Sequence, residues 1–225
     1  MKTTLAIICA IAIAFSAFAQ KTENRPVTAF DKLEVSGAAT VKLSKGEAPS
    51  VRVEADEDDL AKIITEVKNN KLIVKSKGDI KKSFKVYIAY TALSQLDVSG
   101  ASSVQCENAL HTDKLNINAS GASSLDLALS VKELKTEASG ASSVLLNGTV
   151  ENHIAEVSGA ATLKALKLAS AATSIKASGA SSARVNAGKK IKAVANGASS
   201  IHYSGSPEDA EVSSDMSSSV KKSDS

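Results

Sequence analysis

The sequence contains very few aromatic residues: they make up 3% of its 225 residues, and there is no tryptophan. Between Thr91 and His202 there is no Phe, Tyr or Trp at all. Because sugar-binding sites usually stack the sugar ring on an aromatic side chain, this absence argues against binding of neutral glycans along this stretch. Apolar residues still make up 43% of the chain. A core must therefore be built from Val, Leu, Ile and Ala.

Cysteine and long apolar runs are also scarce. The apolar run Leu5–Phe15 is too short to span a bilayer, follows a positively charged start and precedes a small-x-small motif. This pattern predicts a signal peptide over residues 1–19, cleaved before Gln20. The mature chain then has Cys106 as its single cysteine, which excludes an intrachain disulfide. We expect an exported protein without a transmembrane segment after cleavage, located in the periplasm, on the outer cell surface or outside the cell.

Acidic residues are missing from one stretch, since no Asp or Glu occurs between Glu156 and Glu208. The net charge of +3 gives no general argument for nucleic acid as a partner. We predict that the basic residues of this interval bind an anionic polymer such as lipopolysaccharide, an acidic polysaccharide or nucleic acid, of which nucleic acid is the least expected. The alternative is that they are solvated lysines that keep strands from pairing edge to edge. The candidate residues are Lys164, Lys167, Lys176, Arg184, Lys189, Lys190 and Lys192.

The most prominent feature that is present is a repeat, Ser-Gly-Ala-Ser-Ser or a close variant. Its glycines are Gly37, Gly100, Gly121, Gly140, Gly159, Gly179 and Gly197. From Gly100 onward they are separated by 21, 19, 19, 20 and 18 residues, by subtraction of their numbers. A nearly fixed period of this length is typical of a solenoid, in which each repeat buries its apolar face against the next.

The residues around each glycine alternate between apolar and polar. Positions two before, four after and six after the glycine are apolar, whereas the positions three before and five after are mostly polar; Leu145 and Val194 are the exceptions. A period of two predicts strands with one buried face on both sides of each corner. We therefore predict an all-β fold, a single parallel β-helix with coils of about 18–21 residues. We expect right-handed winding, the usual hand of parallel crossovers.

The ends of the repeat differ from its centre. Between the first two glycines, Asp56–Asp59 precede an apolar pair and suit the start of a short helix, and Asn69-Asn70 marks a tight turn between strands. Such a β-rich elaboration would cover one end of the stack. The predicted organisation is a signal peptide (1–19), a flexible N-terminus (20–29), a β-helix domain (30–206) and a loose final coil with a disordered tail (207–225). The domain divides into a first coil with its cap (30–92) and regular coils (93–206).

Several motifs together resemble one bacterial family. They are the Phe30–Gly37 opening, the Asn69–Val74 return strand, the recurring Ser-Gly-Ala-Ser-Ser and the Tyr203–Pro207 segment. The chain is similar to the bacterial auto-transporter adhesin family with the head GIN domain, and the similarity covers nearly all of the mature chain. It implies an exported, β-helical, adhesin-like protein and brings no catalytic residues. No C-terminal membrane barrel follows in this sequence, so self-transport is not implied.

Residues capable of chemistry are present, but their arrangement does not predict a reaction. The repeated serines occupy equivalent corners, whereas an active site is normally unique. His111, His153 and His202 lie at different offsets from their glycines, so they do not predict a shared metal site. The acidic cluster does not match a calcium-binding loop, and Cys106 falls in an apolar column, as a buried small residue would. We predict no catalytic, cofactor or metal site.

The favoured function is that of a non-enzymatic, adhesin-like binding protein that acts through its repeated outer faces. Its expected partner is an anionic envelope polysaccharide or another surface protein, and its oligomeric state is left open. A polysaccharide-active enzyme is the first alternative, and it would need a groove with clustered carboxylates. A structural envelope protein is the second. The outward hydroxyl row from Ser103 to Ser200 also permits ice binding, but serine suits this less well than a regular threonine array.

Overall fold

The computed structural model describes residues 20–78, 80 and 83–223. The predicted signal peptide lies outside these residues. None of the helices in the described part of the chain has the length and apolar composition needed to span a bilayer. Nineteen strands and one short helix, α1 (Glu57–Leu60), make up the described part.

The strands of the N-terminal half are β1 (Lys21–Arg25), β2 (Lys32–Val35), β3 (Ala39–Lys45), β4 (Ser50–Ala55), β5 (Ile63–Lys68), β6 (Lys71–Ser76), β7 (Phe84–Tyr90), β8 (Gln95–Val98), β9 (Ser103–Cys106) and β10 (Leu110–Ala119). Those of the C-terminal half are β11 (Ser124–Ala138), β12 (Ser143–Val157), β13 (Thr162–Ala165), β14 (Leu168–Ala177), β15 (Ser182–Asn186), β16 (Lys190–Ala195), β17 (Ser200–Ser204), β18 (Asp209–Ser214) and β19 (Ser219–Lys222).

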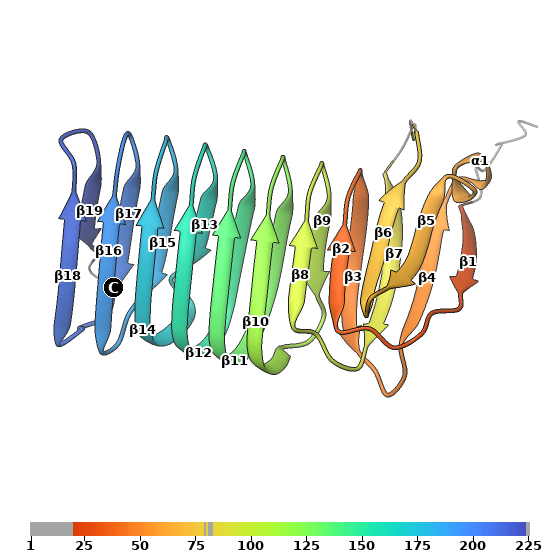
Figure 1. The fold of residues 1–225 in the computed structure, drawn as a ribbon, viewed down its shortest axis with the longest axis horizontal. Coiled ribbons are helices and arrows are strands. Elements are labelled where there is room, and N and C mark those ends of the chain that lie inside the picture. The colour runs from red at the N-terminus through yellow and green to blue at the C-terminus, as the bar shows by residue number, and fades with distance from the viewer. Residues whose placement is uncertain (1–19, 79, 81–82, 224–225) are drawn as a thin grey trace, which may run out of the picture.

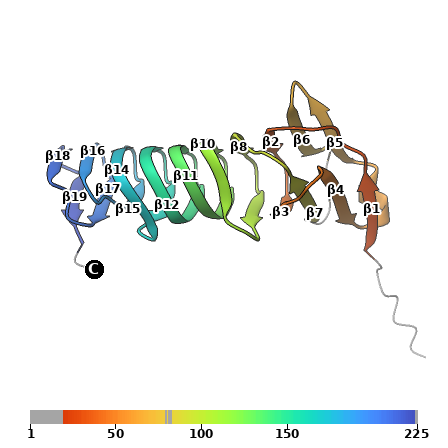
Figure 2. The ribbon, with the colours of Figure 1, turned by 90° about the horizontal axis from the view of Figure 1, so that it is seen from below.

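These strands form a solenoid of parallel stacked coils, as the repeat predicts (Figures 1 and 2). One face, which we call the front face, contains β8, β10, β14, β16 and β18; the opposite rear face contains β9, β13, β15, β17 and β19. The long strands β11 and β12 contribute to both. In Figure 1 the front strands rise, the chain crosses to the rear and descends, and it advances to the left. This is the right-handed winding that we expected.

Glycine is required at the repeated corner for two reasons. Gly159 has a φ of 70°, in the left-handed region that side chains disfavour. A Cβ atom at Gly159 would also lie 2.9 Å from the carbonyl oxygen of Gly140 in the preceding coil. The backbones come this close because the N–H of Ala160 donates a 2.8 Å hydrogen bond to that same oxygen. The repeated glycine therefore sets both the turn and the spacing of the stack.

The core consists of the inward columns found in the sequence. The positions two before and four after each glycine are buried in every coil. In most coils a serine two positions after the glycine also points inward, and several of these serines bond to a neighbouring coil: Ser181 Oγ donates to the carbonyl oxygen of Val157 at 3.2 Å. The equivalent bond of Ser199 to Ala177 measures 3.1 Å. These hydroxyls therefore connect adjacent coils inside the corner.

The N-terminal end is covered by antiparallel strands. β4 pairs with β7, and β5 and β6 form a hairpin whose turn residues Asn69 and Asn70 have φ values of 50° and 59°. The predicted short helix is α1. The predicted flexible N-terminus over 20–29 differs from the structure, because β1 pairs with β4 in antiparallel register. The Arg25 side chain holds it there by donating hydrogen bonds to the carbonyl oxygens of Leu60 and Ile63.

The C-terminal end also differs, as far as Ser223, from the prediction of a loose coil and a disordered tail over 207–225; residues 224 and 225 lie outside the described residues. β18 pairs with β16 and β19 pairs with β17, both in parallel register, so the stack gains another coil. The apolar alternation weakens here, but the acidic side chains of β18 bond to lysines of β16. Lys190 Nζ lies 2.6 Å from Asp209 and Lys192 Nζ lies 2.7 Å from Glu211. The backbone ladder and Val220, which packs against the core, continue the stack here, and the exposed ion pairs accompany it.

Candidate anion-binding site

A row of basic side chains crosses the rear face of the C-terminal coils. Lys164 of β13 is in register with Arg184 of β15, Arg184 with His202 of β17, and His202 with Lys221 of β19. Because these residues occupy the same outward position, their side chains leave the same face at intervals of about 4.8 Å, the spacing of paired strands. We call these four residues the basic row.

A bulge in the chain lies beside the start of this row. Leu145 and Gly148 of one coil are in register with Lys164 and Leu168 of the next. The segment from Lys164 to Leu168 therefore has one residue more than the matching segment of the coil before it. The following coil is shorter again: Ala165 and Ala172 are in register with Val185 and Lys190, and six residues lie between the first two but only four between the second two. The extra residues are accommodated as the turn at Leu166 and Lys167. This turn therefore projects from an otherwise even face.

The bulge and the basic row enclose a depression of about 310 Å³. We call it the basic pocket. Its lining residues are Asp126, Leu145, Asn147, Lys164, Leu166, Lys167 and Arg184. Leu166 is 38% exposed, which is unusual for a large apolar residue in this structure. The pocket therefore combines three cationic side chains with two leucines.

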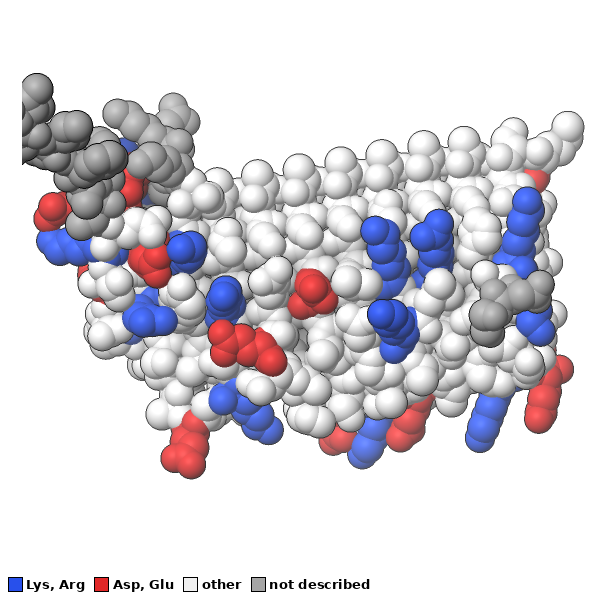
Figure 3. Space-filling view, turned by 180° about the vertical axis from the view of Figure 1, so that it is seen from behind, with Lys and Arg blue, Asp and Glu red and all other residues white. Residues whose placement is uncertain are grey.

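The cations of the basic pocket have no acidic partner in the described part of the chain. The ion pairs found there include none to Lys164, Lys167 or Arg184. Asp126, at the edge of the pocket, lies two strands away from Lys164. In Figure 3, which views the rear face, Lys and Arg side chains stand over the C-terminal coils at the right. The surface is suited to binding negative charge.

The other four predicted residues lie elsewhere. Lys190 and Lys192 are on the front face, where Asp209 and Glu211 neutralise them. Lys176 is also on the front face, next to Glu156 in the same row. Lys189 lies in the turn before β16. The structure thus brings together three of the seven candidates, Lys164, Lys167 and Arg184, and separates the rest from them.

The front face has a larger groove of about 500 Å³, crossing β12 and β14. Its floor includes Ile154, which is 51% exposed, and lysine side chains form its two walls. Each wall lysine has an acidic partner; for example, Lys114 lies 3.2 Å from Glu133. This groove lacks the unpaired positive charge of the basic pocket, so it is less suited to an anion.

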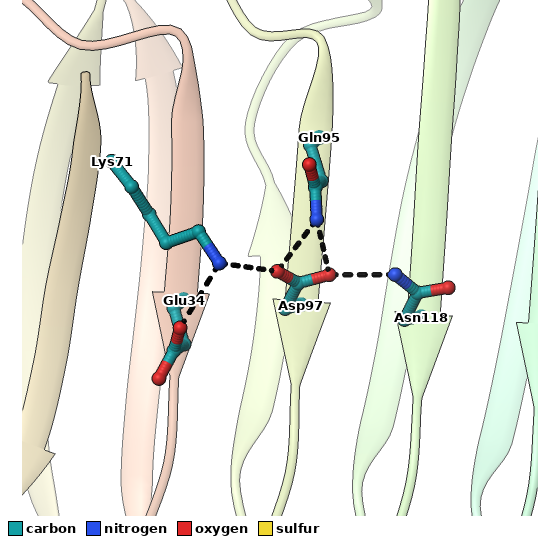
Figure 4. A network of polar contacts seen from close by, with 5 residues as sticks. All are labelled: Glu34, Lys71, Gln95, Asp97 and Asn118. Atoms are coloured by element: carbon teal, nitrogen blue, oxygen red, sulfur yellow. Dashed lines mark hydrogen bonds and ion pairs between the residues drawn. The ribbon is translucent and has the colours of Figure 1, made fainter. Parts of the chain in front are cut away.

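A second polar cluster lies on the front face at the N-terminal end, around Asp97 (Figure 4). Its carboxylate accepts hydrogen bonds from Gln95 at 2.8 Å, Asn118 at 2.7 Å and Lys71 at 3.1 Å. Burial alone would raise the pKa of Asp97, but these bonds outweigh it and hold the pKa below its ordinary value. Lys71 also bonds to Glu34 at 3.1 Å. The cluster links four neighbouring strands, and its satisfied carboxylate is suited to a structural role.

Three of the other side chains that the sequence offered for chemistry are buried or half-buried, and each has a partner within the protein. His153 is buried and its Nε2 lies 3.1 Å from Thr136 Oγ1; burial lowers its pKa to about 4. Cys106 is half-buried 3.9 Å from the Tyr90 hydroxyl, and burial raises the pKa of its thiol. Asp59 is buried and paired with Lys62 at 2.7 Å. In the residues that the structure describes, no three His, Cys, Asp or Glu side chains form a possible metal site.

The sequence interpretation missed some residues of the pocket. Leu145 was visible as an apolar residue in an outward column, and the 20-residue step from Gly159 to Gly179 indicated an insertion. Neither signal located Leu166 beside Lys164, because that placement depends on where within the coil the additional residue lies. Lys221 was missed because its strand was not predicted.

The comparisons with known proteins agree with this fold. The model of the family described as "Putative auto-transporter adhesin, head GIN domain" matches residues 29–207. The chain belongs to this family. The resemblance seen in the sequence motifs is thereby confirmed. Among curated proteins, none matches the chain.

Several solved structures have a similar fold. A "putative adhesin" from Bacteroides fragilis is 24% identical with a TM-score of 0.86; the match covers 91% of this chain and 97% of that one. A "putative lipid binding protein" from Parabacteroides distasonis is 20% identical, with a TM-score of 0.73 and the same coverage. A "putative adhesin" from Parabacteroides merdae is 20% identical, with a TM-score of 0.67 and coverage of 91% and 96%. At these identities the likeness concerns the fold alone.

Proposed function

We propose that this member of the adhesin family is an exported, non-enzymatic binding protein that holds an anionic polymer on its rear face. The observation that carries the proposal is the basic row of Lys164, Arg184, His202 and Lys221, in which each coil contributes one side chain. A linear polymer that runs along the solenoid axis would meet the charged groups of Lys164, Arg184 and Lys221 and, between the last two, the imidazole ring of His202. Lys167 adds a further positive charge beside the row.

The surroundings of the row favour a charged polymer over a neutral one. A row of hydroxyls, including Thr162, Ser182 and Ser200, runs parallel to the basic row in the same strands and can bond to sugar hydroxyls. No aromatic side chain stands between Thr91 and His202 to stack on a sugar ring. Attraction between charges would therefore supply most of the affinity, and salt would weaken it.

The proposal can be tested with polygalacturonate, an acidic polysaccharide, and dextran, a neutral one. The chain from Gln20 onward is titrated with each at low and high salt. We expect binding to polygalacturonate only, weakened by salt. The double variant Lys164→Gln/Arg184→Gln should bind at least about tenfold more weakly, a loss of about 1.4 kcal/mol.

The matched control is Lys190→Gln/Lys192→Gln, which removes the same charge from the front face. Because Asp209 and Glu211 neutralise these lysines, the control should bind like the unchanged protein. Equal losses in both double variants would show that net charge, and not the basic row, governs binding. Binding of neither polymer would overturn the proposal in favour of a structural envelope role.

A further inference from the structure

The basic pocket contains more apolar surface than a site for a purely hydrophilic anion requires. Leu145 and Leu166 lie within the same depression as Lys164, Lys167 and Arg184. We propose that the pocket binds an anionic amphiphile, in which a phosphate or carboxylate is attached directly to a hydrocarbon chain. This inference rests on one part of the proposed function, the binding of an anion by Lys164 and Arg184, and it names another class of anionic ligand for that site.

The apolar part of the pocket departs from the repeat at two positions. Leu145 occupies an outward position that is Asp126 in the coil before and Lys164 in the coil after. Leu166 lies on the bulge, which has no counterpart in the next coil. Neither leucine is needed for the stacking of the coils, since the inward columns already provide the core. The outward Leu145 and the inserted Leu166 are thus two separate exceptions to the repeat, and both line the same pocket.

The charges of the pocket are placed to hold the anionic end of such a ligand. Lys164 and Arg184 are neighbours in adjacent strands, and Lys167 follows Leu166 directly on the bulge. The guanidinium of Arg184 can donate two parallel hydrogen bonds to a phosphate or carboxylate. A hydrocarbon segment next to that group would then contact Leu145 and Leu166. Asp126 at the opposite edge would repel a second anion there.

The size of the pocket limits what it can hold. A volume of about 310 Å³ is at the lower end of the range for small-molecule sites. The pocket therefore suits the anionic group and the first few methylenes of a chain, with the remainder of the ligand outside. Each methylene that becomes buried should tighten binding roughly fourfold.

The front-face groove provides a comparison within the same molecule. It has an exposed isoleucine, Ile154, but its lysines are paired with acidic residues such as Glu133 and Asp209. An amphiphile whose anionic group has to be held should therefore prefer the basic pocket. Ile154 supplies a control position at which an exposed apolar side chain can be removed without changing the pocket.

The test compares hexyl phosphate with inorganic phosphate by calorimetric titration of the chain from Gln20. We expect hexyl phosphate to bind at least about tenfold more tightly. The variant Leu145→Ser/Leu166→Ser should abolish this preference, whereas Ile154→Ser should preserve it. Hexyl glucoside, which has the chain without the charge, should bind much more weakly than hexyl phosphate. Unfolding midpoints of all variants establish that each one is folded.

The outcomes separate this inference from the proposed function. If polygalacturonate binds through Lys164 and Arg184 but hexyl phosphate binds no better than phosphate, the amphiphile inference is wrong and the polymer proposal stands. If hexyl phosphate is preferred and polygalacturonate does not bind, the inference stands and the polymer proposal fails. If Leu145→Ser/Leu166→Ser keeps the preference for hexyl phosphate, the pocket is not its site and the inference is overturned.

Discussion

Lys164 and Arg184 are register partners in adjacent parallel strands, and both side chains leave the rear face unpaired with any acid in the described chain. Like charges at neighbouring positions of a sheet repel each other. The anionic ligand proposed above, held by both cations, would relieve this repulsion.

This repulsion leads to a prediction about stability. Replacing Arg184 with Gln should raise the free energy of unfolding at low salt by about 0.5 kcal/mol, because a like-charge contact is removed. The gain should vanish near 1 M salt, where the screening length is about 3 Å. Denaturant titrations at the two salt concentrations measure both effects. A loss of stability at low salt would show that Arg184 supports the fold.

The stacked glycines lead to a second prediction. Gly140→Ala places a Cβ 2.9 Å from the Gly121 carbonyl oxygen at a φ of 69°, so both strain and a backbone clash oppose it. We expect a loss of about 3 kcal/mol or more. Gly78 is the matched control, since it has a φ of 75° but, among the described residues and apart from its chain neighbours, no atom within 4 Å of an added Cβ. Gly78→Ala should cost only about 1 kcal/mol. Equal losses would mean that the turn conformation, and not the stacking, requires glycine.

The inward serines can be tested by exchanging serine and alanine. Ser181→Ala removes the bond to the Val157 carbonyl oxygen and should cost about 1 kcal/mol. Ala161 occupies the equivalent position one coil earlier, between Ser142 and Ser181, and is buried. Ala161→Ser should be tolerated, with a change within about 1 kcal/mol, because the corner already accommodates a hydroxyl in the neighbouring coils. Thermal unfolding compares both variants; a severe loss in Ala161→Ser would contradict the equivalence of the coils.

The buried histidine predicts a dependence of stability on pH. His153 stays neutral in the folded state because burial lowers its pKa to about 4, whereas the unfolded chain takes up its proton below pH 6.5. The unfolded state therefore binds more protons, and stability falls as the pH decreases from 6.5 to 4. The contribution of this residue amounts to about 3 kcal/mol over that range.

The variant His153→Gln isolates this effect, since glutamine can still bond to Thr136 but does not titrate. Carboxylates contribute equally to both proteins, so the difference between their pH profiles belongs to His153. We expect the variant to lose much less stability between pH 6.5 and 4. Parallel profiles would show that the imidazole is protonated, or reached by water, within the fold.

Much of this fold follows from residues that the sequence makes visible. The period of the glycines determines a solenoid, because only stacked coils bury the face of each repeat. The alternation around each corner determines which side chains point inward, since strand neighbours point to opposite sides. Where the alternation weakened after Pro207, the pattern no longer predicted the strands at 209–214 and 219–222. Pairing of Lys190 and Lys192 with Asp209 and Glu211 accompanies the added coil there.

Which residues form the candidate site, in contrast, depends on the tertiary structure. The sequence showed seven basic residues without an intervening acid, but Lys190 and Lys192 gain acidic partners from the next coil and Lys164 and Arg184 do not. Which residues meet across coils depends on the register and on the length of each turn. A turn lengthened by one residue places Leu166 beside Lys164, and the repeat pattern by itself does not give that position. The sequence by itself determined the solenoid fold and its inward-facing residues. The stacking of coils of unequal length determined which side chains meet in the basic pocket.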